Sequence, residues 1–422
     1  MIDLLKENKT FCRLVVYRVF SALGGGVFRL FMLLSVHLLY ENPIYTGIAS
    51  FLMMAPHFFS FAAGPVIDRA NKVKAMRWTT LIEFIAVGLL AFISFQGSVH
   101  VLFMFAVILL YTVAQVFEAP AGNAFLRKIV DECEIMKANS LINIAVTVGG
   151  LIVAALLLGA LDGDVEHSFI YALSAVFLVL CFIVSFFLKD ITARVEDLQK
   201  ENAFKKYFAE LKEGSRYVSR TKFLLYFLIA GIAASFFMDV AYTNMPEFAT
   251  THVGAQGYVV LTVATLAGAL VSSVIAGLVG DKFRVGMLVC FVWILAGVLR
   301  IGFAYTLPVS YIGGLAILFG YFTILGFSGM LRNTLIQKTP KENMVARVVT
   351  VHTTLISVAG ALGALAGGFI GGVVSSLTHV FVLHGAIYIL LGIVLILSPS
   401  IRKLPRVNEI KSDEDIELIQ LS

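Results

Sequence analysis

The chain has 422 residues, of which 59% are hydrophobic and 14% are charged, and its formal net charge is +5. A soluble domain usually carries about 25% charged residues, so this composition excludes a soluble globular protein and indicates a chain that faces lipid. The basic residues form no soluble basic face, which argues against nucleic-acid binding, and the four cysteines support neither a disulfide framework nor a metal site.

Twelve apolar stretches are long enough to cross a bilayer as helices, which takes about 20 residues. We expect them at 13–40, 44–67, 75–96, 99–126, 138–161, 168–188, 221–249, 257–280, 286–306, 309–336, 346–374 and 378–399. The first is too long for a signal peptide and is kept as a span. The runs lack the alternation of barrel strands, so the predicted fold class is an all-α membrane protein.

A long polar break separates the first six spans from the last six. The chain is therefore divided into an N-terminal bundle (1–188), a cytoplasmic linker (189–220), a C-terminal bundle (221–400) and a cytoplasmic tail (401–422). Within the linker, Phe204, Tyr207, Phe208 and Leu211 fall at helical spacing. They predict an amphipathic helix, either on the inner membrane surface or solvated as a connector.

Orientation follows from the distribution of Lys and Arg. If both termini are cytoplasmic, 29 of the 32 basic residues lie on the inner side, and Arg18, Arg29 and Arg300 lie within spans. The positive-inside rule therefore predicts a multi-pass protein with both termini in the cytoplasm.

A motif of the form Gly-x-x-x-Asp-basic occurs after span 2 and again after span 8. Its residues are Gly64, Asp68 and Arg69 in the first copy, and Gly277, Asp281 and Lys282 in the second. A second echo pairs Asn123 at the end of span 4 with Asn333 at the end of span 10. Two matches at corresponding positions predict duplicated six-helix halves. In span 11, Gly363, Gly367 and Gly371 recur every fourth position, which favours close helix packing.

The first copy, continued to Lys72, resembles the signature loop of the major facilitator superfamily. The stretches 126–130 and 137–141 resemble a bacterial branch of that family, which contains macrolide efflux proteins and the enterobactin exporter. The resemblance implies two pseudo-symmetric six-helix bundles in a bacterial inner membrane, a small-molecule substrate and no cofactor. It also implies a role for the signature-loop residues: Asp68 faces a helix N-terminus as a gating latch and Asp281 does the same in the other half. The alternative is that these residues only fix loop geometry.

Three ionisable residues within spans are candidates for coupling transport to protons or substrate. Glu118 lies two residues before Pro120, where a helix can bend, and Asp239 lies beyond the middle of span 7. Arg29 follows three consecutive glycines. The structural alternative is a fixed ion pair, Arg29 with Asp239 for example. Charges inside a bilayer cost at least about 2.5–3.5 kcal/mol, so each needs a partner or water. Arg18 and Glu247 near span ends, and Glu83 in the inner part of span 3, are weaker candidates.

These observations predict a secondary transporter rather than an enzyme, because the chain has no P-loop and no soluble domain for a catalytic site. The expected activity is proton-coupled export, by antiport, of a small amphipathic compound such as a drug, a macrolide or a siderophore-like molecule. Two alternatives stay open: a transporter of a lipid or metabolite on the same fold, and a transport-inactive membrane sensor or assembly protein.

Overall fold

The computed structural model describes residues 8–59, 67, 71–97, 99–131, 134–162, 166–188, 203–279, 284–341, 344–402, 404 and 406. Within these residues every regular element is helical, apart from one isolated bridge between Arg284 and Arg406. The chain forms two compact units, Met1–Phe204 and Lys205–Ser422.

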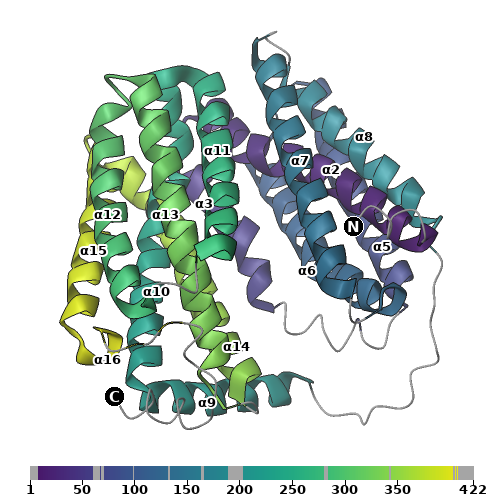
Figure 1. Ribbon diagram of the computed structural model, residues 1–422. Helices are drawn as coiled ribbons and strands as arrows, with labels where there is room; N and C mark the ends of the chain where they lie inside the picture. The colour runs from purple at the N-terminus through teal and green to yellow at the C-terminus, as the bar shows by residue number, and fades with distance from the viewer. Residues whose placement is uncertain are drawn as a thin grey trace. The chain divides into compact units, whose positions relative to one another are not determined.

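The first unit is built from a series of helices that begins near the N-terminus (Figure 1). Its elements are α2 (Lys9–Tyr40), α3 (Pro43–Met54), the 3-10 helix η1 (Ala55–Phe59), α5 (Lys72–Phe95), α6 (Val101–Ile129), α7 (Ile135–Asp162) and α8 (His167–Ser185). Asparagine side chains cap the start of three of them: Asn8 accepts from the N–H of Phe11, Asn42 from that of Ile44 and Asn71 from that of Lys74. The second predicted span corresponds to α3 and η1, and its remainder, 60–66, lies outside the described residues.

The second unit begins within an 18-residue helix, α9 (Ala203–Arg220). Its remaining elements are α10 (Lys222–Thr243), α11 (Met245–Val279), α12 (Val285–Thr306), α13 (Tyr311–Lys338), α14 (Val345–Val373), α15 (Thr378–Leu397) and α16 (Pro399–Arg402). Helical geometry breaks inside α11 at Gly254, whose φ is 74°. The seventh span therefore runs through α10 to this glycine and the eighth follows it, a boundary a few residues beyond the predicted one.

The two units repeat the same helix pairings. The packed pairs α2·α7, α2·α8, α3·α6, α5·α6 and α5·α8 of the first unit correspond to α10·α14, α10·α15, α11·α13, α12·α13 and α12·α15 of the second. The helix breaks that end the first and seventh spans also correspond. Glu41 and Gly254 both have a positive φ, 47° and 74°, and they are 213 residues apart. The same offset separates Gly64 from Gly277. The packing of the helices therefore shows the same duplication that the motif predicted.

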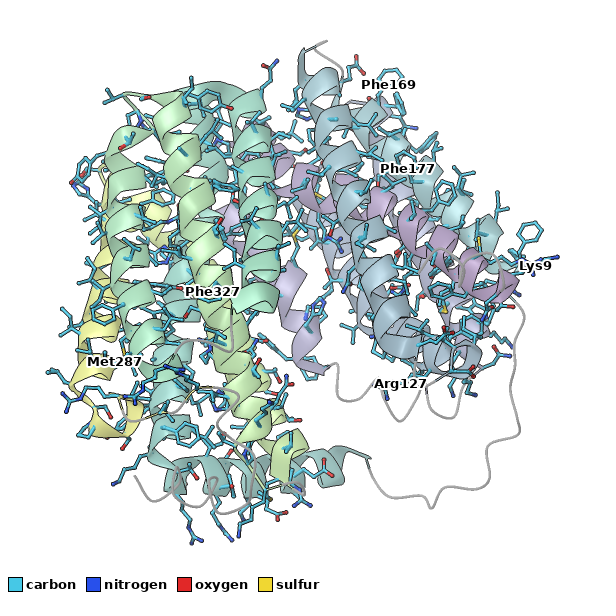
Figure 2. The ribbon with its side chains drawn as sticks, in the orientation of Figure 1. Lys9, Arg127, Phe169, Phe177, Met287 and Phe327 are labelled. Atoms are coloured by element: carbon cyan, nitrogen blue, oxygen red, sulfur yellow. The ribbon has the colours of Figure 1, made fainter. Side chains whose placement is uncertain are left out.

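The outer surfaces of both units are apolar. Large side chains such as Phe169 and Met287 are exposed and project from the helices (Figure 2). Eleven helices in the described part of the chain are long and apolar enough to cross a membrane, and α3 with η1 covers the described part of the other predicted span, 44–67. The exposed apolar surface is explained if it faces lipid, so the predicted all-α membrane fold is confirmed.

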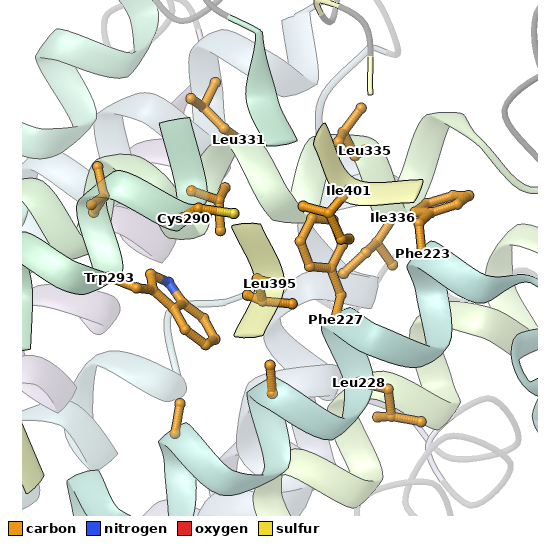
Figure 3. Packing of buried hydrophobic residues seen from close by; sticks show 14 of the residues in the cluster. Phe223, Phe227, Leu228, Cys290, Trp293, Leu331, Leu335, Ile336, Leu395 and Ile401 are labelled. Atoms are coloured by element: carbon orange, nitrogen blue, oxygen red, sulfur yellow. The ribbon is translucent and has the colours of Figure 1, made fainter. Parts of the chain in front are cut away.

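Buried apolar side chains hold the second unit together. One cluster joins α10, α12, α13, α15 and α16 (Figure 3) and includes Phe227, Trp293 and Leu335. Between α10 and α14 the contact is backbone to backbone: a Cβ on Gly367 would lie 2.8 Å from the carbonyl oxygen of Val240, and one on Gly363 would overlap that of Phe236. Small residues therefore permit this close approach, as the spacing in span 11 predicted.

Helix α9 packs on the end of α14 (Figure 1). A Cβ on Gly214 would lie 2.7 Å from the carbonyl oxygen of Arg347, Val218 is buried, and Arg347 pairs with Glu213 at 2.8 Å. One face of α9 thus contacts protein, which neither sequence alternative included. On the predicted apolar stripe Phe208 is exposed, while the side chains of Phe204 and Tyr207 lie outside the described part.

Candidate functional site

A buried ion pair joins α2 to α6. Arg18 Nη1 lies 3.4 Å from both carboxylate oxygens of Glu118, and the side chains are 14% and 3% exposed. Arg18 Nη2 also donates to Asn123 Oδ1 at 3.2 Å and to the carbonyl of Ala119 at 3.5 Å. Gly122 lies against the guanidinium, and a Cβ there would overlap it. One stretch of α6 thus supplies the carboxylate, the amide and the space that this arginine needs.

A second carboxylate lies in the same core. Glu83 on α5 is fully buried, and Gln115 Nε2 donates to its Oε1 at 2.9 Å. The same amide nitrogen lies 3.3 Å from the hydroxyl of Tyr111, while Glu83 Oε2 has no hydrogen-bond partner among the described residues. The charges of Glu83 and Glu118 act on each other. Two carboxylates and one hydrogen-bonded guanidinium leave a negative charge that Arg29, a proton or another cation has to offset in a low-dielectric core.

Arg29 is the other cation near this cluster. It lies on α2 one turn after Gly25, and its charge acts on Glu83 and Tyr111. Its side chain is nevertheless exposed, and within the described residues it forms no ion pair. An arginine in the middle of a membrane span is costly against lipid, so this exposed side chain needs water or a ligand.

Asp239 is the buried acid of the second unit. It lies on α10 with 8% of its surface exposed, and Ser235, one turn earlier, donates to Oδ2 at 3.3 Å. No cation pairs with it among the residues that the structure describes. A carboxylate in this position needs a proton, water or a ligand to offset its charge.

Two arginines inside helices of the second unit, the buried Arg300 and the half-buried Arg332, contact aromatic rings. The Arg300 guanidinium lies 4.8 Å from the ring centre of Phe381 and 5.3 Å from that of Tyr321, and the guanidinium of Arg332 lies 5.9 Å from that of Trp293. Within the described part of the chain no carboxylate pairs with either arginine. Cation–π contacts offset a buried charge by about 2 kcal/mol, which is less than an ion pair can supply.

Arg332 occupies a place related by the repeat to that of Gly122. Arg332 follows Gly122 by 210 residues, which is also the offset between Asn123 and Asn333. In the same way Gly231 stands at the position that corresponds to Arg18, 213 residues earlier. A Cβ on Gly231 would lie 3.9 Å from Arg332 Nη1. The first half has its arginine on α2 and its glycine on α6, whereas the second half has the glycine on α10 and the arginine on α13.

The carboxylate of the first half is missing from the second. Ser328 follows Glu118 by the same 210 residues, is buried, and has a hydroxyl without a partner among the described residues. The exchanged arginine therefore has lost its acidic partner.

The structure brings two of the weaker candidates together with Glu118. Arg18 was discounted because it lies near a span end, and Glu83 because it lies in the inner part of span 3, but both are in the buried network around Glu118. Arg332 was counted with the inner basic residues, yet it lies inside α13. A usable signal was present, since opposite charges within spans need each other as partners.

The signature-loop residues are mostly outside the described part of the chain: Gly64, Asp68, Arg69, Asp281 and Lys282. Lys72 is described and is buried at the first position of α5. Gly277 lies near the end of α11. The gating role of these residues stays a prediction.

Known proteins resemble this chain in both sequence and fold. The chain is 25% identical over 313 residues to "Putative bacilysin exporter BacE" of Bacillus subtilis, covering 74% of this chain and 76% of the relative, and equally similar to its namesake from Bacillus amyloliquefaciens. Among solved structures, the nucleoside transporter NupG aligns over 93% of this chain and 99% of its own with a TM-score of 0.68 at 15% identity. A peptide transporter POT solved with sulfate aligns over 94% and 96%, with a TM-score of 0.72 at 12% identity.

The family model for the Major Facilitator Superfamily matches residues 14–364. This match covers all of the first unit's described helices apart from the first turns of α2, and it continues into α14 of the second. The helix pairings repeated between the two units are what a duplicated six-helix architecture requires. The chain belongs to the Major Facilitator Superfamily of transporters.

Proposed function

We propose that this transporter exports a small amphipathic compound by alternating access, driven by the entry of protons. The buried network of Glu83, Gln115, Glu118 and Arg18 is the observation that carries the proposal, because it holds more negative charge than its bonded cation offsets. The relatives named as bacilysin exporters support the direction of transport. The protein is placed in a bacterial inner membrane with both termini in the cytoplasm.

Proton binding in the first half acts through the Arg18–Glu118 pair. When Glu118 takes up a proton, its attraction for Arg18 falls and the contact that joins α2 to α6 weakens. The guanidinium keeps its bond to Asn123 and becomes available to another acceptor. Protonation and the arrangement of two spans are coupled in this way.

Asp239 is the second coupling candidate, and its surroundings make it the more sensitive one. Only the Ser235 hydroxyl donates to it among the described residues, so neutralisation by a proton removes a charge that nothing else offsets. Arg29, whose side chain is exposed, is the candidate for contact with an anionic or polar part of the substrate.

The gate is assigned to the two copies of the signature loop. Asp68 and Asp281 act as latches at helix N-termini, Arg69, Lys72 and Lys282 pair with acids on neighbouring helix ends, and Gly64 and Gly277 permit close helix approach. The burial of Lys72 at the start of α5 supports this assignment, because a buried ammonium group requires an acceptor.

Everted membrane vesicles test the proposal. Bacilysin is the first probe, followed by a macrolide and a catecholate siderophore. We expect energised vesicles to accumulate one of them, a protonophore to abolish the accumulation, and addition of that compound to dissipate a pH gradient reported by a fluorescent amine. Accumulation that survives the protonophore would rule out proton drive.

Variants separate coupling from binding. Asp239→Asn should abolish gradient-driven accumulation while leaving exchange of substrate across the membrane without a gradient. Asp131→Asn changes the same chemical group at an exposed position and should leave both activities intact. If Asp239→Asn and Glu118→Gln both accumulate substrate as the unmodified protein does, neither residue carries the coupling proton.

A further inference from the structure

A pocket of about 390 Å³ opens on the first unit where α5 begins and α8 ends. It is lined by Asn71, Val73, Lys74, Arg77, Trp78 and Leu188. Its volume lies within the range of small-ligand pockets, about 300–1,000 Å³. The pocket adjoins the end of the first signature loop, and none of its lining residues belongs to the Arg18–Glu118 network.

The pocket carries positive charge that the protein leaves available. Arg77 Nη2 donates to the carbonyl of Ser185 at 3.3 Å and its guanidinium lies 4.1 Å from the ring centre of Phe186, so the end of α8 holds it in place. A second guanidinium, from Arg13, donates to the carbonyl of Phe187 at 3.0 Å. Lys74 is exposed. Among the described residues no carboxylate pairs with Lys74 or Arg77, the two cations that line the pocket.

Aromatic side chains place the pocket at the level of the lipid headgroups. Trp78 is 56% exposed and lies six residues, or about 9 Å, beyond the start of α5. Phe186 and Phe187 are also exposed at the end of α8. Tryptophan is enriched where a membrane protein passes from hydrocarbon to headgroups, because one part of its ring system is apolar and the other is polar.

We propose that this pocket binds the headgroup of an anionic phospholipid, with Lys74 and Arg77 on the phosphate and Trp78 against the first part of an acyl chain. Basic pockets beside membrane helices recognise anionic headgroups by charge. A free phosphate would use the same cations but would leave the exposed aromatic rings unexplained. Because the pocket touches both α5 and α8, a bound lipid stabilises the contact between these two helices.

The two tryptophans of the chain provide a direct assay. Trp293 is buried in the second unit, so Trp293→Phe leaves Trp78 as the reporter. One bilayer is phosphatidylcholine with a minor fraction of brominated phosphatidylglycerol, and the other is phosphatidylglycerol with the same mole fraction of brominated phosphatidylcholine. We expect stronger quenching of Trp78 fluorescence in the first bilayer. Lys74→Gln should lower this preference about fivefold, the equivalent of the roughly 1 kcal/mol that one basic side chain contributes at an anionic surface.

Lys128→Gln is the matched control, because it removes the same charge from an exposed position at the end of α6. It should leave the preference unchanged. An equal loss in the two variants would show a general charge effect and overturn the proposal, as would competition by soluble glycerol phosphate, which would identify a site for free anions. The unmodified chain gives an independent measurement: phosphatidylglycerol should co-purify with it, and less should co-purify with Lys74→Gln.

Discussion

Glu118→Gln removes the charge that faces Arg18 and keeps the shape of the side chain nearly unchanged. Breaking a buried ion pair by neutralising one partner costs about 3–5 kcal/mol, because the other charge stays buried without compensation. The distance of 3.4 Å and the 14% exposure of Arg18 place this pair at the lower end. We therefore expect Glu118→Gln to lower the free energy of unfolding by about 3 kcal/mol.

A double-mutant cycle isolates the interaction from other effects of the substitutions. Arg18→Met leaves Glu118 without a cation and should cost a similar amount, while the double variant removes both charges. The double variant should therefore be more stable than the sum of the single effects predicts, with a coupling free energy of about 2 kcal/mol.

Unfolding by sodium dodecyl sulfate in mixed micelles, followed by circular dichroism, measures these differences. Glu213→Gln is the matched control: its pair with Arg347 is shorter, at 2.8 Å, but the side chains are 53% and 30% exposed, so the loss should stay below about 1 kcal/mol. Equal losses in Glu118→Gln and Glu213→Gln, or additive effects in the cycle, would refute the reasoning that burial determines the contribution of this pair.

Three further substitutions test the packing and the charge of the two halves. Gly122→Ala places a methyl group against a guanidinium and should cost about 1–3 kcal/mol in the same assay, whereas Gly159→Ala, where a Cβ meets nothing within 4 Å, should be neutral or slightly stabilising. Gly363→Leu overlaps the α10 backbone and should sharply reduce the yield of monodisperse protein on size-exclusion chromatography; a normal yield would contradict the backbone contact. Ser328→Glu offers Arg332 a carboxylate one helical turn away and should raise the unfolding midpoint, while the uncharged Ser328→Gln should not.

The architecture could be predicted from the sequence because the bilayer imposes a length and an apolar surface on every span. The repeat was visible in the sequence because Gly64 and Gly277 stand 213 residues apart in matching motifs, and the two halves also pair their helices alike. Boundaries were less certain where one helix runs on into the next, as at Gly254.

The partners within the site could not be predicted in the same way. Hydropathy gives the depth of Arg18, Glu83 and Glu118 in the membrane but not the direction in which each side chain points, and that direction decides which charges meet. Hydropathy likewise gives no sign that the guanidinium of Arg332 contacts the ring of Trp293. The packing of α9 on α14 needs a glycine at position 214, because the backbone of Arg347 lies against it, and this contact cannot be read from the sequence.

The two halves of this transporter share a backbone arrangement but differ in how they compensate charge. In the first half Arg18 has a carboxylate partner, Glu118, and removal of that carboxylate should affect stability as well as function. In the second half Arg332 contacts the ring of Trp293, and among the described residues it has no acidic partner. Asp239 on α10 has no cationic partner among those residues either. A charge already neutralised by its neighbour responds weakly to a ligand, whereas an uncompensated one gains most when a proton or an anion arrives. Because of this difference, Asp239 should respond more strongly to a proton than Glu118 does, and the Arg18–Glu118 pair should also set the stability of the helices around it.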